Sequence, residues 1–150
     1  MKLNTIKTMT AAAALILVAG AAHVTSGAEL EESCRQPPAT VIEMTGINSS
    51  HARARAKYTE PDIIKACHEG YVYQRGWSPE ECIRQTKLDL LGHEISAEAN
   101  CAQGTLRLEG LGRLLFKMPV HGDCATGGIF AVPTFKMLCP QYRGRIENPL

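Results

Sequence analysis

The spacing of apolar positions is helical in the middle of the chain and becomes alternating in the C-terminal half. The first helical stretch follows Thr59, a capping residue, with Pro61 in its first turn. Ile63 and Cys67 then lie one turn apart on a single face, and Gly70 is a suitable terminator. This pattern predicts a helix between Thr59 and Gly70.

A second helix carries a more complete set of start and stop signals. Ser78 can cap it, Pro79 fits its first position, and Glu81 stands where a capping box places an acid. An apolar stripe follows from Cys82, and Gly92 can end the helix. Because the connection between the two helices is short, we expect them to form an antiparallel helical hairpin.

The C-terminal half predicts an antiparallel sheet of about four strands. Apolar and polar residues alternate from Ile95 to Cys101, and "TLRL" and "RLLFKM" continue this alternation between glycine-containing turns. The run "IFAVPTFKMLC" predicts a last strand that is interrupted at Pro133. The expected fold is therefore α+β, with an N-terminal helical hairpin packed on a small C-terminal antiparallel sheet.

The residues before the helices predict an export signal followed by an irregular arm. Basic residues precede the run "MTAAAALILVAGAA", and small residues up to Ala28 match a signal-peptidase site. This run of about 14 residues is shorter than the roughly 20 that cross a bilayer. We expect a signal peptide over 1–28, an irregular arm over 29–57, one domain over 58–140 and a tail over 141–150. The mature protein would be periplasmic or secreted, with no stable membrane insertion.

Charge and composition exclude some classes of partner. The 150 residues include 16 basic and 15 acidic side chains, for a formal net charge of +1. A nucleic-acid-binding protein normally has a clear basic excess, so we expect no nucleic-acid partner. The run "HARARAK" at 51–57 could bind phosphate or an acidic partner. We interpret it as a solvated segment because it is short and the chain is nearly neutral.

Six cysteines in an exported chain predict three disulfides. The sequence has no CxxC pair, which weighs against a thioredoxin-like redox site, a zinc ribbon and haem attachment. In an antiparallel hairpin Cys67 and Cys82 lie at the same end, so we expect them to be bonded. The other expected pairs are Cys101 with Cys139 and Cys34 with Cys124.

Candidate catalytic groups are few and have simpler structural explanations. No GxSxG, HExxH, P-loop or GxGxxG motif is present. Cys82 at a helix N-terminus could be a reactive thiolate, but the even cysteine count favours a disulfide. His121 and Asp123 could act as base and orienting acid, yet turn formation explains them better. We expect no catalytic residue, no metal ligands and no cofactor.

An aromatic connection between the predicted helices is the main candidate for binding. Tyr71, Tyr73, Arg75 and Trp77 are of the types that dominate protein-binding hot spots. The same side chains could instead cover the end of the helix pair, with Trp77 acting as a hydrophobic staple.

Two functional hypotheses remain from the sequence. The first is a non-enzymatic binding, inhibitor or envelope accessory module that contacts another protein of the envelope or exterior. The alternative is a small secreted hydrolase that uses Cys82 or the loop with His121 and Asp123.

Overall fold

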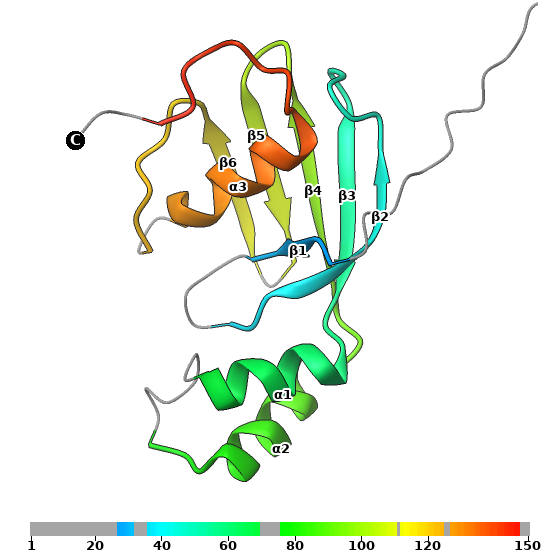
Figure 1. The fold of residues 1–150 in the computed structure, drawn as a ribbon, viewed down its shortest axis with the longest axis vertical. Helices are drawn as coiled ribbons and strands as arrows, with labels where there is room; N and C mark the ends of the chain where they lie inside the picture. Colours follow the sequence, from blue (N-terminus) through cyan, green and yellow to red (C-terminus); the bar gives the residue numbers. More distant parts are fainter. Residues whose placement is uncertain (1–26, 32–35, 70–75, 111, 125–126, 148–150) are drawn as a thin grey trace, which may run out of the picture.

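The computed structural model describes residues 27–31, 36–69, 76–110, 112–124 and 127–147. These residues form one antiparallel sheet of six strands, in which each strand pairs with the next along the chain, together with three helices (Figure 1). The elements are β1 Glu29–Leu30, β2 Ala39–Thr45, β3 Ala52–Lys57, α1 Glu60–Glu69, α2 Pro79–Leu90, β4 Glu94–Asn100, β5 Thr105–Glu109, β6 Arg113–Lys117 and α3 Gly128–Leu138.

The predicted architecture is wrong in strand number and in the position of the helices. The segment 29–57, expected to be irregular, forms β1, β2 and β3. In β3 the alanines are buried and the charged side chains between them are exposed, which is the alternation of a half-buried strand. Alanine is a weak strand former, so a run of alternating alanine and arginine does not carry the usual composition of a strand.

The helical hairpin is an insertion between β3 and β4, at one end of the sheet (Figure 1). β3 and β4 pair directly with each other, from Ala52 opposite Ala99 to Lys57 opposite Glu94. Beyond Lys57 the Tyr58 N–H donates to the His93 carbonyl, and the Gly92 N–H donates to the Tyr58 carbonyl. The helices therefore occupy the loop of a β-hairpin and do not cover the sheet.

The predicted start of α2 is confirmed, although the Glu81 carboxylate bonds to Arg84 and Gln85. Gly70, the predicted terminator of the first helix, lies outside the described residues. The Ser78 side chain accepts a hydrogen bond from the Glu81 N–H at 3.2 Å, and Pro79 begins α2. At the start of α1, the Thr59 N–H donates to the Asp62 carboxylate at 2.9 Å. The buried Asp62 also accepts a hydrogen bond from Thr40 Oγ1 at 2.8 Å, which fastens α1 to β2.

The structure contains the disulfide expected between Cys67 and Cys82, with Cα atoms 5.9 Å apart. It lies in a small apolar cluster with Ile63, separate from the main core. Trp77 and Ile83, both partly buried, pack against this cluster. The hairpin therefore has its own apolar contacts as well as its own covalent link.

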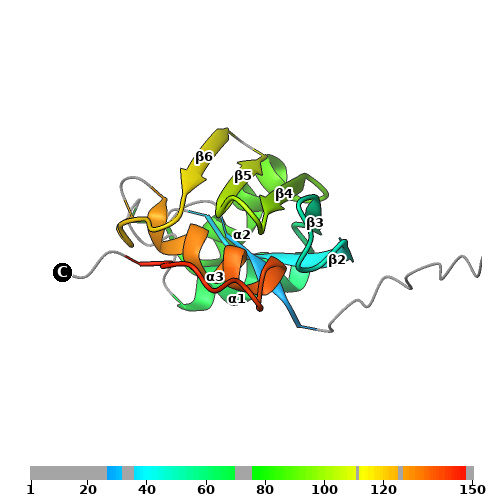
Figure 2. The ribbon, with the colours of Figure 1, turned by 90° about the horizontal axis from the view of Figure 1, so that it is seen from above.

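The run predicted as the last strand is the helix α3, which lies across one face of the sheet while the sheet curls around it (Figure 2). An uninterrupted apolar run of this length suits a buried helix as well as a strand. Pro133 lies on the exposed side of α3, whereas Phe135 and Leu138 are fully buried. The small alanines of β3 and β4 allow the helix to approach the sheet closely.

A second disulfide, between Cys101 and Cys139, connects the turn after β4 to the end of α3. This is also an expected pair. Cys124 is disulfide-bonded, while Cys34 lies outside the described residues, so their pairing stays a prediction. The C-terminal segment returns to the core, where Tyr142 packs edge-on against Phe135 with ring centroids 5.0 Å apart.

Candidate functional site

The aromatic connection predicted as a binding patch is only partly described. Tyr71, Tyr73 and Arg75 lie outside the described residues. Trp77 is half-buried against the cluster around the Cys67–Cys82 disulfide. This contact agrees with the covering role that the sequence allowed for Trp77, and the binding role of the four residues stays a prediction.

The hydrolase that would use Cys82 is contradicted by the structure. Cys82 is bonded to Cys67 and does not titrate, so it supplies no thiolate. His121 and Asp123 are exposed on the segment between β6 and α3. No group of three or more His, Cys, Asp or Glu side chains among the described residues is arranged to hold a metal ion.

The face of the sheet opposite α3, hereafter the outer face, carries a row of paired charges across four strands. We call this row the charge ladder (Arg53, Glu98, Arg107, Glu109 and Arg113). Three pairs stand directly opposite each other in the strand register: Arg53 and Glu98, Glu98 and Arg107, and Glu109 and Arg113. Arg107 and Glu109 lie two residues apart on β5, on the same face.

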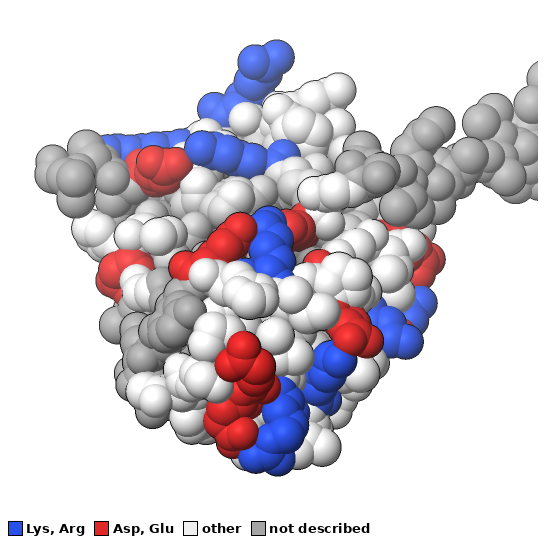
Figure 3. Space-filling view, turned by 60° about the horizontal axis from the view of Figure 1, so that its bottom comes forward, with Lys and Arg blue, Asp and Glu red and all other residues white. Residues whose placement is uncertain are grey.

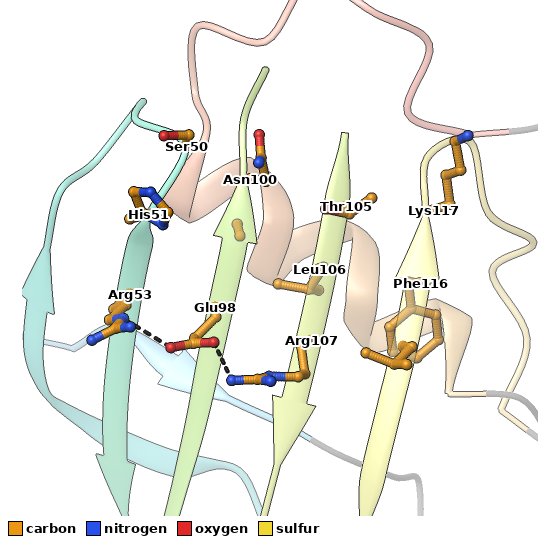
Figure 4. A pocket seen from close by; sticks show the side chains of 12 residues that line it. Ser50, His51, Arg53, Glu98, Asn100, Thr105, Leu106, Arg107, Phe116 and Lys117 are labelled. Carbon is orange, nitrogen blue, oxygen red and sulfur yellow. Dashed lines mark hydrogen bonds and ion pairs between the residues drawn. The ribbon is translucent and has the colours of Figure 1, made fainter. Parts of the chain in front are cut away.

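Ion pairs connect the charge ladder from one end to the other. Glu98 lies at its centre and pairs with Arg53 at 2.8 Å on one side and with Arg107 on the other (Figure 4). Arg107 continues to Glu109 at 3.5 Å, and Glu109 pairs with Arg113 at 3.3 Å. The bonding of Arg107 to two carboxylates fixes its position more firmly than a single surface ion pair would.

A second ion-pair cluster lies on the same face beside the charge ladder. Arg55 donates to Glu43 at 2.9 Å and to Glu94 at 2.7 Å. The hydrogen bond from Arg55 lowers the pKa of the Glu94 carboxyl below its ordinary value. The same contact, followed by that with Glu43, raises the pKa of Arg55, so the charged forms of Arg55 and Glu94 stabilise each other.

The outer face is hollowed above the charge ladder. A depression of about 490 Å³ is lined by Arg53, Glu98 and Arg107, with Thr105 and Lys117 at its upper end (Figure 4). Ser50, His51 and Asn100 also line it. The lining contains three cationic side chains and one carboxylate, so its net charge is positive. The hydroxyl and amide groups of the lining can donate or accept hydrogen bonds.

Acidic and basic side chains are interspersed elsewhere on the surface. The face seen from the helical-hairpin end shows them side by side (Figure 3). A positive depression on a surface of mixed charge favours local recognition of an anionic group over broad electrostatic attraction.

The alternation in "ARARAK" and "TLRLE" contained the signal for the outer face, since every second residue is charged in the first segment and polar or charged in the second. The sequence reading missed this site because it did not assign β3 as a strand. Unless β3 is assigned as a strand, the position of Arg53 opposite Glu98 cannot be predicted.

Neither a search for membrane-spanning helices nor a comparison with known proteins adds to this picture. Within the described ranges, no helix combines the length and apolar character needed to cross a membrane. Comparisons with protein-family models, with curated proteins and with solved structures find no match to this chain.

Proposed function

We propose that this protein is an exported, non-enzymatic binding module that uses the outer face of its sheet to recognise another protein of the envelope or exterior. The observation that carries the proposal is the depression above the charge ladder, in which polar and cationic groups are already positioned by cross-strand pairing. Groups that are fixed before binding lose little conformational entropy when a partner docks.

Two disulfides among the described residues support the export part of the proposal. They join Cys67 to Cys82 and Cys101 to Cys139, and such bonds persist mainly in oxidising compartments. The first strand begins at Glu29, the residue that follows the expected cleavage site. The Ala28 carbonyl accepts a hydrogen bond from the Val41 N–H at 2.9 Å, so cleavage after Ala28 would remove one bond to β2.

The export proposal is tested by expressing the full chain in a Gram-negative host and fractionating the cells. We expect the protein in the periplasm or medium, with an intact mass that corresponds to a chain beginning at Glu29 and with no thiol that reacts after denaturation. A full-length protein in the cytoplasm with reactive thiols would contradict the proposal.

The binding surface is tested by adding a bulky side chain to the depression. Thr105→Trp places a large uncharged group on the outer face without entering the core, because the Thr105 side chain lines the depression. Leu88→Trp is the matched control, since Leu88 is 73% exposed on α2, at the other end of the molecule. Both variants are immobilised and exposed to envelope extract beside the wild-type protein.

We expect Thr105→Trp to lose the proteins that the wild type retains, while Leu88→Trp keeps them. Identical recovery by the wild type and both variants would remove the outer face as the binding surface. Loss with Leu88→Trp alone would place the surface on the helical hairpin.

A further inference from the structure

Within the described ranges, the strand β6 is the last strand of the sheet and pairs only with β5. The hydrogen bonds next to it show which backbone groups point toward the open side. The Met118 N–H donates to the Gly104 carbonyl, and at the other end of the hairpin the Gly110 N–H donates to the Gly112 carbonyl. In an antiparallel pair this direction alternates, so the N–H groups of alternate β6 residues, Arg113, Leu115 and Lys117, point away from β5.

No described strand pairs with the open side of β6. None of the backbone hydrogen bonds outside the ladder of β5 and β6, among the described residues, uses the N–H of Arg113, Leu115 or Lys117. The Leu115 side chain is 70% exposed, so it can contact a segment that adds at this edge. An exposed edge strand with an apolar side chain is a template onto which another extended segment can add.

The charges that flank Leu115 determine what kind of segment fits. Both Arg113 and Lys117 place cations on the outer face at the same edge. Arg113 has one long ion pair with Glu109, at 3.3 Å, and Lys117 has no ion pair with any described residue. A strand added at this edge would place its own side chains directly opposite these two cations and Leu115.

A second copy of this chain is a poor occupant of the edge. In antiparallel pairing about Leu115, each Arg113 would face the Lys117 of the other copy. In parallel pairing in register, each cation would face its own equivalent. Like charges directly opposite each other destabilise a strand pair, so the edge disfavours self-association.

We propose that the partner of the outer face contributes an extended acidic segment, which adds along β6 as a seventh strand. The segment has the pattern acidic–x–apolar–x–acidic, with its acidic residues opposite Arg113 and Lys117 and its apolar residue opposite Leu115. The two intervening side chains point toward the α3 side, beside the partly buried Leu114 and Phe116. This inference rests on the proposed binding function and specifies the chemistry of the partner.

The test uses a labelled peptide with the core Glu-Thr-Leu-Thr-Glu and, as its matched control, the same peptide with the core Lys-Thr-Leu-Thr-Lys. Binding to the full mature chain is measured by fluorescence anisotropy and by amide chemical shifts. Two cross-strand charge pairs change from attractive to repulsive between the peptides, so we expect the acidic peptide to bind about tenfold more tightly. The amides of Arg113, Leu115 and Lys117 should shift and become protected from hydrogen exchange.

Two variants separate strand addition from simple charge attraction. Leu115→Pro removes an N–H that points outward, and proline is tolerated at such edge positions, so we expect folded protein with binding weakened about tenfold or more. Leu115→Thr keeps the N–H and should bind more tightly than Leu115→Pro. Lys117→Glu should weaken binding of the acidic peptide and strengthen binding of the basic one.

Each contrary result overturns a defined part of the inference. Equal affinity for the two peptides would overturn the acidic specificity, and unchanged binding by folded Leu115→Pro would overturn strand addition. A dimer in sedimentation that Leu115→Pro abolishes would identify a second copy as the occupant and also overturn the inference. If one of these contrary results is found while Thr105→Trp still loses the envelope partner, this inference fails and the proposed function stands.

Discussion

Removal of the two described disulfides, one at a time, should destabilise the protein by different amounts and in different regions. The Cys101–Cys139 bond closes a sequence separation of 38 residues, and the Cys67–Cys82 bond closes one of 15. In the chain-entropy model the longer loop contributes about 3.9 kcal/mol and the shorter about 3.0 kcal/mol. Against a total stability of about 5–15 kcal/mol, either loss is large.

The regions affected differ because the two bonds lie in different parts of the fold. Cys101–Cys139 holds α3 against the sheet, so its replacement by two alanines should lower the stability of the main core. Cys67–Cys82 lies within the inserted helical hairpin, which has its own apolar cluster. Its replacement should loosen the hairpin while the sheet keeps its pairing.

Guanidinium unfolding followed by two signals can measure this difference. Trp77 is the single tryptophan of the chain and packs beside the Cys67–Cys82 disulfide, so its fluorescence reports on the hairpin. Far-ultraviolet circular dichroism reports on the sheet and the helices together. In Cys67→Ala/Cys82→Ala we expect the fluorescence transition at lower denaturant than the dichroism transition.

Two results would refute this reasoning. A greater loss of stability in Cys67→Ala/Cys82→Ala than in Cys101→Ala/Cys139→Ala would contradict the dependence on loop length. Coincident fluorescence and dichroism transitions in Cys67→Ala/Cys82→Ala would show that the hairpin does not unfold as a unit of its own.

Three further substitutions test local contacts. Asp62→Ala removes the carboxylate that accepts hydrogen bonds from the capping residue Thr59 and from Thr40 of β2, and calorimetry should show a loss of about 2 kcal/mol. Gly128→Ala places a Cβ 1.6 Å from the His121 carbonyl oxygen, which the backbone cannot absorb, so denaturant unfolding should show a loss of about 2 kcal/mol. Arg55→Gln should raise the pKa of Glu94 toward its ordinary value in an NMR titration, because the hydrogen bond from Arg55 lowers it. In the wild type this pairing is complete above the ordinary carboxyl pKa and is lost as pH falls through the lowered one.

Each of these substitutions has a control elsewhere in the chain. Gly112→Ala should be nearly neutral, since its added Cβ meets nothing within 4 Å. Arg84→Gln removes an ion pair on α2 and should leave the Glu94 titration unchanged. Thr40→Val removes one of the bonds to Asp62 and should cost less than Asp62→Ala. An equal loss in Thr40→Val and Asp62→Ala would show that the helix cap contributes nothing.

Elements with local end signals were predictable from the sequence, and elements that depend on tertiary packing were not. The Glu81 N–H donates to the Ser78 side chain within one turn, so a few adjacent residues determine where α2 starts. The state of the α3 segment depends on what covers it, because an apolar run with Pro133 fits an interrupted strand or a helix with proline on its open side.

The charged residues of the outer face could be predicted from the sequence, but their positions relative to one another could not. Alternating charges in β3 and β5 are visible in the sequence. Glu98 stands between Arg53 and Arg107 only because of the register of β3, β4 and β5. The whole helical insertion separates β3 from β4 in the sequence. No local pattern contains this register.

The insertion of the helical hairpin between β3 and β4 has a consequence for the order in which the chain folds. The two strands must meet across residues 58–93, and closing a flexible loop of that length costs about 2 kcal/mol more than closing a short turn. Since the contacts of the helices are close in sequence, we expect the helices to form first and to bring Tyr58 near Gly92, to which it is hydrogen-bonded in the folded structure. On this expectation the middle of the chain is the nucleus, and the sheet grows outward from β3 and β4 toward both of its edges.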